Sequence, residues 1–180
     1  LEYAFELARK RRQRLASIDK ANVLSDMYGL WRAEVNAVAS NYPDVVVDHL
    51  IVDAATMWMI RQPEMFDVVV APNMFGDILT DLGAAIQGGL GIGPGANLNP
   101  KGTSMFEPIH GSAPPLKGTQ TANPIATIWS GAMMLDFLGE AHAASAVLAA
   151  IETNVAAGRV RTPDLGGTNS TAEVGDDIAA

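Results

Sequence analysis

The chain has 180 residues, 48% of them hydrophobic and 18% charged, so it carries enough apolar side chains for a packed core and is not intrinsically disordered. Twenty acidic residues against twelve lysines and arginines give a net charge of −8, which disfavours nucleic acid as a partner. Because there is no cysteine and no apolar run near the ~20 residues of a membrane-spanning helix, disulfides and thiolate chemistry are excluded, and we expect a cytoplasmic protein without a membrane partner.

Predicted helices and strands alternate along the first half of the chain. Apolar residues at helical spacing predict a helix over residues 1–8, and we interpret the basic run Arg9-Lys10-Arg11-Arg12 as helix-terminal cations in preference to a nucleic-acid patch. A short strand is predicted around 15–18, a helix from about 26 to 38, and a turn at 41–44.

The same alternation continues up to residue 87. The pattern predicts a strand from Val45 to Val52, a helix over 56–60 that ends near Pro63, a short buried strand over 66–70 and a helix from about 76 to 86. Strands that alternate with helices in this way predict an α/β fold.

The glycine-rich stretch 88–95 is incompatible with an ordinary helix and predicts a boundary. We therefore expect two parts, residues 1–87 and 88–180. The second part is predicted to hold two apolar helices and then a loop before a short final helix, at residues 124–138, 140–155 and 162–168.

Two aspartates, Asp77 and Asp81, lie four residues apart on the predicted 76–86 helix, so their side chains share one face. Oxygen ligands of this kind favour a hard ion such as Mg²⁺ or Mn²⁺, and the alternative is a solvated acidic face. The helix is otherwise almost uncharged and follows a strand, where open α/β sheets bind ligands. Asp53 ends a second strand, the one predicted from Val45 to Val52, and either supplies a third carboxylate or caps a helix.

Lys20 and Asn22 follow the predicted strand at 15–18. A lysine near a metal ion can have its pKa lowered enough to act as a base, whereas the plain alternatives are a surface lysine and a turn-forming asparagine. Small residues in the segment 107–114 (EPIHGSAP) would let backbone N–H groups approach a phosphate. This segment lacks the standard Rossmann and P-loop patterns.

Several segments occur in the same order as in a known enzyme family. They resemble the metal-dependent β-decarboxylating dehydrogenases, which comprise 3-isopropylmalate, isocitrate, homoisocitrate and tartrate/D-malate dehydrogenases. The matching segments are 19–24 (DKANVL), 52–54 (VDA), 73–81 (NMFGDILTD), 106–114 (FEPIHGSAP), 123–124 (NP) and 163–167 (PDLGG). The 73–81 block is the most specific, and DKANVL followed by Leu30-Trp31-Arg32 looks most like 3-isopropylmalate dehydrogenase.

The resemblance implies an isopropylmalate dehydrogenase-like α/β fold whose sheet order is not that of a Rossmann fold. It further implies a two-domain architecture of which this chain covers the C-terminal half. Residues 1–87 would belong to the smaller, dimer-forming domain that binds metal and substrate, and residues 88–180 would complete the large cofactor-binding domain.

The resemblance also implies roles for the acidic residues and the lysine. Asp77 and Asp81 would bind Mg²⁺ or Mn²⁺ from one subunit of a homodimer, and Asp53 would reach the same ion from the partner. Lys20, also donated across the dimer, would help to remove the proton of the substrate hydroxyl, with Asp53 nearby. These two residues would be catalytic and, together with Asn22, would bind the substrate.

For the cofactor, the resemblance places Asn22 near the nicotinamide. The adenosine side would contact six further residues: His110, Gly111, Ser112, Ala113, Leu116 and Asn123. NAD-dependent members carry Asp-Ile where this chain has Pro115-Leu116, and the Lys-Tyr type pair of NADP-dependent relatives is also absent. We expect NAD, with NADP as the alternative.

The expected function is therefore the NAD- and Mg²⁺- or Mn²⁺-dependent oxidative decarboxylation of a 2-hydroxy acid, 3-isopropylmalate in leucine biosynthesis. The alternatives are isocitrate, homoisocitrate or tartrate/D-malate as the substrate, or a non-catalytic subunit of the same fold. Family chains are roughly twice this length, and their front half supplies the substrate-binding arginines and the catalytic tyrosine. We therefore expect the 180-residue chain to be inactive by itself.

Overall fold

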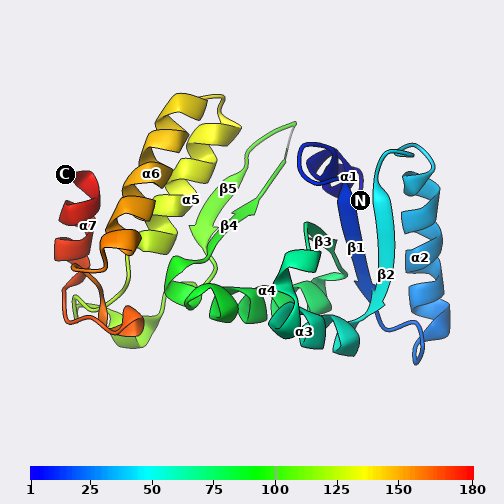
Figure 1. Cartoon of the computed structure of the whole chain (residues 1–180), viewed down its shortest axis with the longest axis horizontal. Coiled ribbons are helices and arrows are strands. Elements are labelled where there is room, and N and C mark those ends of the chain that lie inside the picture. Colours follow the sequence, from blue (N-terminus) through cyan, green and yellow to red (C-terminus); the bar gives the residue numbers. More distant parts are fainter. Residues whose placement is uncertain (100) are drawn as a thin grey trace. The chain divides into compact units, whose positions relative to one another are not determined.

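The computed structural model describes residues 1–99 and 101–180, which form two compact units, Leu1–Gly83 and Ala84–Ala180 (Figure 1). The division falls inside α4 (Asn73–Gln87), slightly before the expected boundary after residue 87. The glycine-rich stretch that predicted the boundary belongs to the second unit, where it forms a short 3₁₀ turn and the start of a strand.

The first unit is built on a parallel sheet with the strand order β2-β1-β3. Its strands are β1 (Arg14–Asp19), β2 (Val46–Ile51) and β3 (Val68–Val70), and the helices that precede α4 are α1 (Glu2–Arg9), α2 (Ser25–Ala39) and α3 (Val52–Arg61). The first strand is central, whereas the second strand is central in a standard Rossmann half. This agrees with the expected non-Rossmann order, and it makes β1 buried from Leu15 to Asp19.

Two prediction boundaries in the first unit are wrong. The strand predicted to reach Val52 ends at Ile51, and α3 begins at Val52 rather than near Thr56. Asp53 consequently lies in the first turn of a helix and not at the end of a strand, where the helix dipole favours its negative charge. The N-terminal cap position of α3 is Ile51, so the helix-cap alternative for Asp53 is also wrong.

The core of the first unit consists of two neighbouring apolar clusters. The fully buried Leu15 and Phe5 centre one of them, and Ile18 with Tyr28 and Phe75 centres the other. The Tyr28 and Phe75 rings stack with centroids 5.5 Å apart, which ties α2 to α4. These contacts hold the carboxyl ends of the strands and the start of α4 within one rigid unit.

The basic run after α1 is used within the fold. Arg9 forms an ion pair with Asp44 and lies over the Tyr42 ring, while the Arg12 guanidinium bonds to the Glu64 and Phe66 carbonyls. Arg9 lies in the last turn of α1, as the interpretation of helix-terminal cations expects, and both arginines have partners within the first unit. The Arg9 contact also lowers the pKa of Asp44 through a direct hydrogen bond.

The second unit pairs a hairpin of antiparallel strands with helices. Its elements are β4 (Pro94–Asn97), β5 (Met105–Pro108), α5 (Ile125–Phe137), α6 (Ala141–Ala157) and α7 (Thr171–Ala179). Figure 1 shows α5 and α6 side by side, joined in one core by the buried Ile125, Ile151 and Val174. Both helices lie close to their predicted spans.

The strand β4 was missed because Pro94 and Gly95 both disfavour a strand. Pro94 is tolerated because it is the first residue of β4, in a hairpin of only two strands. At Gly95, a Cβ atom would lie 3.1 Å from the Glu107 carbonyl oxygen, so the close pairing favours a residue without a side chain. None of the described helices has both the length and the apolarity that crossing a membrane requires.

Candidate active site

The carboxyl edge of the parallel sheet brings Lys20 and Asp53 together. Asp19 and Ile51, the last residues of β1 and β2, are register partners, so the segments that follow leave the sheet side by side. The Lys20 ammonium donates a hydrogen bond to the Asp53 carboxylate across the 33 residues that separate them in sequence. The carboxyl ends of parallel strands are where α/β folds build ligand sites.

This ion pair is open to solvent on its acidic side. The Lys20 side chain is 27% exposed and that of Asp53 is 67% exposed. The hydrogen bond from Lys20 lowers the pKa of Asp53, so the carboxylate stays ionised at neutral pH. The pair therefore presents an accessible anion beside an amine that is largely shielded.

Asp77 and Asp81 project from the first half of α4 and are exposed. Among the described residues neither forms an ion pair with a basic side chain, and Asp77 has only a long contact, 3.4 Å, from the Asn73 amide. Two uncompensated carboxylates one helical turn apart fit a hard divalent cation, which takes oxygen ligands.

Within the described part of one chain, no group of three acidic or histidine side chains is arranged to hold a metal ion. Asp53 and the two α4 carboxylates therefore do not form a complete three-carboxylate site in a single copy. The cross-subunit arrangement implied by the family resemblance would supply the third ligand from a second copy.

Sequence reasoning missed an ion pair next to Lys20, between the buried Asp19 and the partly exposed Arg32. Asp19 is 0% exposed, and Arg32 from α2 donates to both of its carboxylate oxygens, at 2.6 and 3.0 Å. The signal in the sequence was a charged residue at the end of a strand whose residues 15–18 are uncharged, since a buried carboxylate requires a partner. Asn22, in the turn after Lys20, is exposed.

The residues expected at the adenosine side of the dinucleotide lie in the second unit, most of them in the segment after β5. Gly111 and Ala113 both have positive φ, 66° and 40°, so the backbone between Pro108 and the 3₁₀ turn Pro114–Leu116 reverses tightly. Ser112 and Leu116 are exposed there. The His110 ring nitrogen Nδ1 lies 2.7 Å from the Gly111 carbonyl oxygen, which orients the imidazole.

Asn123 differs from the loop residues because its side chain is 7% exposed and already bonded on both ends. Its Oδ1 accepts from the Ile125 N–H at 2.9 Å, and its Nδ2 donates to the Asp164 carboxylate at 3.0 Å. Pro124 is the residue before α5, and the Asn123 amide oxygen satisfies the otherwise free N–H of Ile125, the first residue of the helix. The Asn123 side chain therefore serves the fold, in the manner of a helix cap.

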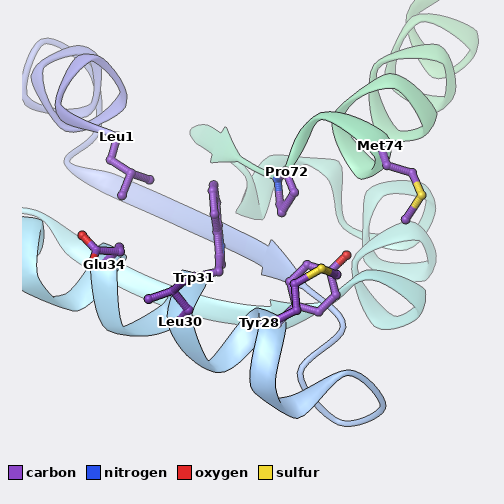
Figure 2. Close-up of a pocket in the computed structure, with 8 residues that line it drawn as sticks. Leu1, Tyr28, Leu30, Trp31, Glu34, Pro72 and Met74 are labelled. Carbon is purple, nitrogen blue, oxygen red and sulfur yellow. The ribbon is translucent and has the colours of Figure 1, made fainter.

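An apolar pocket of about 650 Å³ lies elsewhere on the first unit (Figure 2). It contains none of the expected site residues. Figure 2 shows Tyr28 and Trp31 of α2 on one side and Pro72 and Met74 on the other, and Glu34 is the one charged lining residue. Burial of a charged ligand in this apolar lining would be costly, so the charged groups at the Lys20–Asp53 edge are the better candidate site for such a ligand.

Comparisons with known proteins match nearly the whole chain. Residues 1–178 match the isocitrate/isopropylmalate dehydrogenase family. The chain is 51% identical to the decarboxylating D-malate dehydrogenase of Escherichia coli (strain K12), over 99% of this chain and 51% of that protein. It is 47% identical to the 3-isopropylmalate dehydrogenase of Leifsonia xyli subsp. xyli, over 100% of this chain and 51% of that protein.

Among solved structures, isocitrate dehydrogenase from Methylococcus capsulatus superposes with a TM-score of 0.93 at 42% identity. That match covers 98% of this chain and 52% of the other, so the chain spans about half the length of the relatives it matches. Family match, identity and fold agree: this chain belongs to the isocitrate/isopropylmalate dehydrogenase family of decarboxylating dehydrogenases.

Proposed function

We propose that the complete polypeptide containing this chain oxidises and decarboxylates a 2-hydroxy acid, using NAD and a divalent metal ion, as a homodimer. The observation that carries the proposal is the Lys20–Asp53 pair at the carboxyl edge of the sheet, together with the two uncompensated carboxylates of α4. Asp77 and Asp81 of one copy and Asp53 of the other would hold Mg²⁺ or Mn²⁺, which when bound acidifies the substrate hydroxyl as a Lewis acid.

The residues of this chain can move the hydroxyl proton. A lysine accepts a proton only in its neutral form, so the proton that Lys20 donates to Asp53 must first leave the pair for water. The exposure of Asp53 provides this path, since it contacts both the amine and the solvent. Asn22, in the turn beside Lys20, would contact the substrate and the nicotinamide.

The loop at residues 110–113 would hold the adenosine side of the cofactor, joined by Leu116 and by the backbone at Asn123. Pro115 and Leu116 offer no carboxylate to the ribose hydroxyls, while Lys117 ends the 3₁₀ turn and could contact a 2′-phosphate. We place NAD first and NADP second, and the ratio of kcat/KM for the two dinucleotides decides between them.

3-Isopropylmalate is the first substrate candidate because several relatives carry that name and the DKANVL segment resembles theirs. D-Malate is the second, because the E. coli enzyme of that name is 51% identical to the chain. The test compares kcat/KM of the complete enzyme for 3-isopropylmalate, D-malate and isocitrate with Mg²⁺ or Mn²⁺, by absorbance of the reduced nicotinamide. A preference for isocitrate would refute the leading substrate, and no turnover of any acid would refute the function.

Sharing of the site between subunits has its own test, in which two inactive variants are mixed. A dimer of Lys20→Ala and Asp77→Asn chains has one site with both residues intact, so random mixing should restore about a quarter of wild-type activity. A site within a single chain would give no recovery. The non-catalytic alternative predicts that Asp77→Asn leaves Mn²⁺ affinity unchanged. The 180-residue chain alone is expected to be inactive, and its turnover would contradict the need for further residues.

A further inference from the structure

The ion pair between Asp19 and Arg32 is also hydrogen-bonded to the backbone next to Lys20. Besides its two bonds from Arg32, the buried Asp19 carboxylate accepts the Ala21 N–H at 2.9 Å. Asp19 and Ala21 flank Lys20 in sequence, so this bond closes a tight turn around it. Three donors from two elements thus converge on one carboxylate.

The turn continues beyond Ala21 with a second set of bonds. The Val23 and Leu24 N–H groups both donate to the Lys20 carbonyl oxygen at 3.0 Å. The backbone of Lys20 is therefore held on its amino side by β1 and on its carboxyl side by the start of α2. With its Cα fixed in this way, the lysine side chain is aimed at Asp53.

A contribution to stability does not account for the pair. Burying a carboxylate has a desolvation cost that the ion pair only offsets, and apolar residues of similar size commonly serve a core equally well. The planar guanidinium, in contrast, fixes the carboxylate in one orientation because it donates two bonds in a fork. The hydrogen bonds to Asp19 raise the pKa of the Arg32 guanidinium further above its usual value, so Arg32 stays charged.

We propose that Asp19 and Arg32 are positioning residues that set the location of the Lys20 amine at the active site. The proposal rests on the proposed function for the role of Lys20. Since a misplacement of about 1 Å at a reacting group can lower a rate by ~100-fold, loss of the fork should lower kcat by about 10- to 100-fold. Neither residue is among those expected to bind the substrate or the cofactor, so KM for the dinucleotide should stay within about 2-fold.

The test uses Arg32→Lys in the complete enzyme, because lysine keeps a positive charge beside the buried Asp19 but lacks the fork. Asp19→Asn is the second variant, since it keeps an acceptor for the Ala21 N–H. Arg14→Lys is the matched control. Arg14 begins the same strand and pairs with Asp48 at 2.9 Å, but that pair is half-exposed and far from the Lys20 turn along β1.

Two measurements follow, kcat and hydrogen exchange at the Ala21 amide. The expected result is a lowered kcat and faster Ala21 exchange in Arg32→Lys, neither change in Arg14→Lys, and no further loss of kcat when Arg32→Lys is added to Lys20→Ala. Equal losses in both backgrounds, or a kcat like that of the control, would overturn the proposal.

A failure of the proposed function looks different. If the wild-type enzyme turns over none of the hydroxy acids, that function is wrong and Ala21 exchange alone judges the positioning. Faster exchange in Arg32→Lys than in Arg14→Lys then supports a fork that holds the Lys20 turn, and equal exchange in the two variants rejects it.

Discussion

Replacing Asn123 with alanine should destabilise the second unit, because this one side chain makes a buried and a partly buried hydrogen bond. Asn123→Ala removes the cap of α5 at the Ile125 N–H and the bond to Asp164. Loss of a helix cap costs about 1 kcal/mol. A hydrogen bond to a charged group contributes about 1.5–3 kcal/mol when shielded, which we reduce to ~1 because Asp164 is exposed. The expected loss is about 2 kcal/mol.

A reversed pair provides the control. In Asn123→Asp the cap is kept, but two carboxylates then face each other at hydrogen-bond distance, so this variant should also be destabilised. Adding Asp164→Asn places an amide at position 164 that can donate to the carboxylate introduced at position 123. The same amide can still accept from the Thr162 hydroxyl, which donates to Asp164 in the wild type. The double variant should therefore recover to within about 1 kcal/mol of wild type.

Urea unfolding of the complete protein measures these free energies, and hydrogen exchange at the Ile125 amide places the change at the start of α5. A double variant as unstable as Asn123→Ala would refute the reasoning, because it would show that the two bonds are not what stabilises this region. An Asn123→Ala protein with unchanged stability and weakened NAD binding would instead assign the side chain to the cofactor.

Three further predictions concern other residues. Gly91→Ala should cost about 1–3 kcal/mol in urea unfolding, because a Cβ atom there would overlap a carboxylate oxygen of Asp164, the partner of Asn123; wild-type stability would show that the Asp164 side chain moves aside without cost. Lys20→Met should raise the pKa of Asp53 toward the usual ~4, measured by NMR titration of the carboxyl group, and an unmoved pKa would exclude Lys20 as the cause of the shift. The wild-type pair stabilises the fold above that pH and loses this contribution as pH falls through the lowered pKa of Asp53, so the variant should lack it. Burial lowers the pKa of His49, so on acidification the unfolded chain takes up a proton at a higher pH than the folded one, and the free energy of unfolding should fall below about pH 6.5. His49→Gln should lose less of this free energy between about pH 7.5 and 5.5, and the same pH dependence in variant and wild type would contradict the prediction.

The sequence predicted the α/β class and the approximate span of most helices, because hydrophobic periodicity reports which residues are buried. It also predicted that two carboxylates share a face of α4, since residues four apart on a helix are neighbours wherever the helix lies. Boundaries were less accurate where local preference and tertiary packing disagree. Asp53 shifted from a strand end to a helix turn, and β4 formed despite Pro94 and Gly95.

Which distant groups meet was decided by the tertiary structure alone. Asp19 pairs with Arg32 because α2 lies against the central strand. Lys20 contacts Asp53 because β1 and β2 end in register. The family resemblance places Asn123 at the cofactor, yet both ends of its side-chain amide are hydrogen-bonded within the second unit. Spacing along the chain determines contacts within one helix or strand, whereas contacts between elements depend on the sheet order and register, which no local pattern encodes.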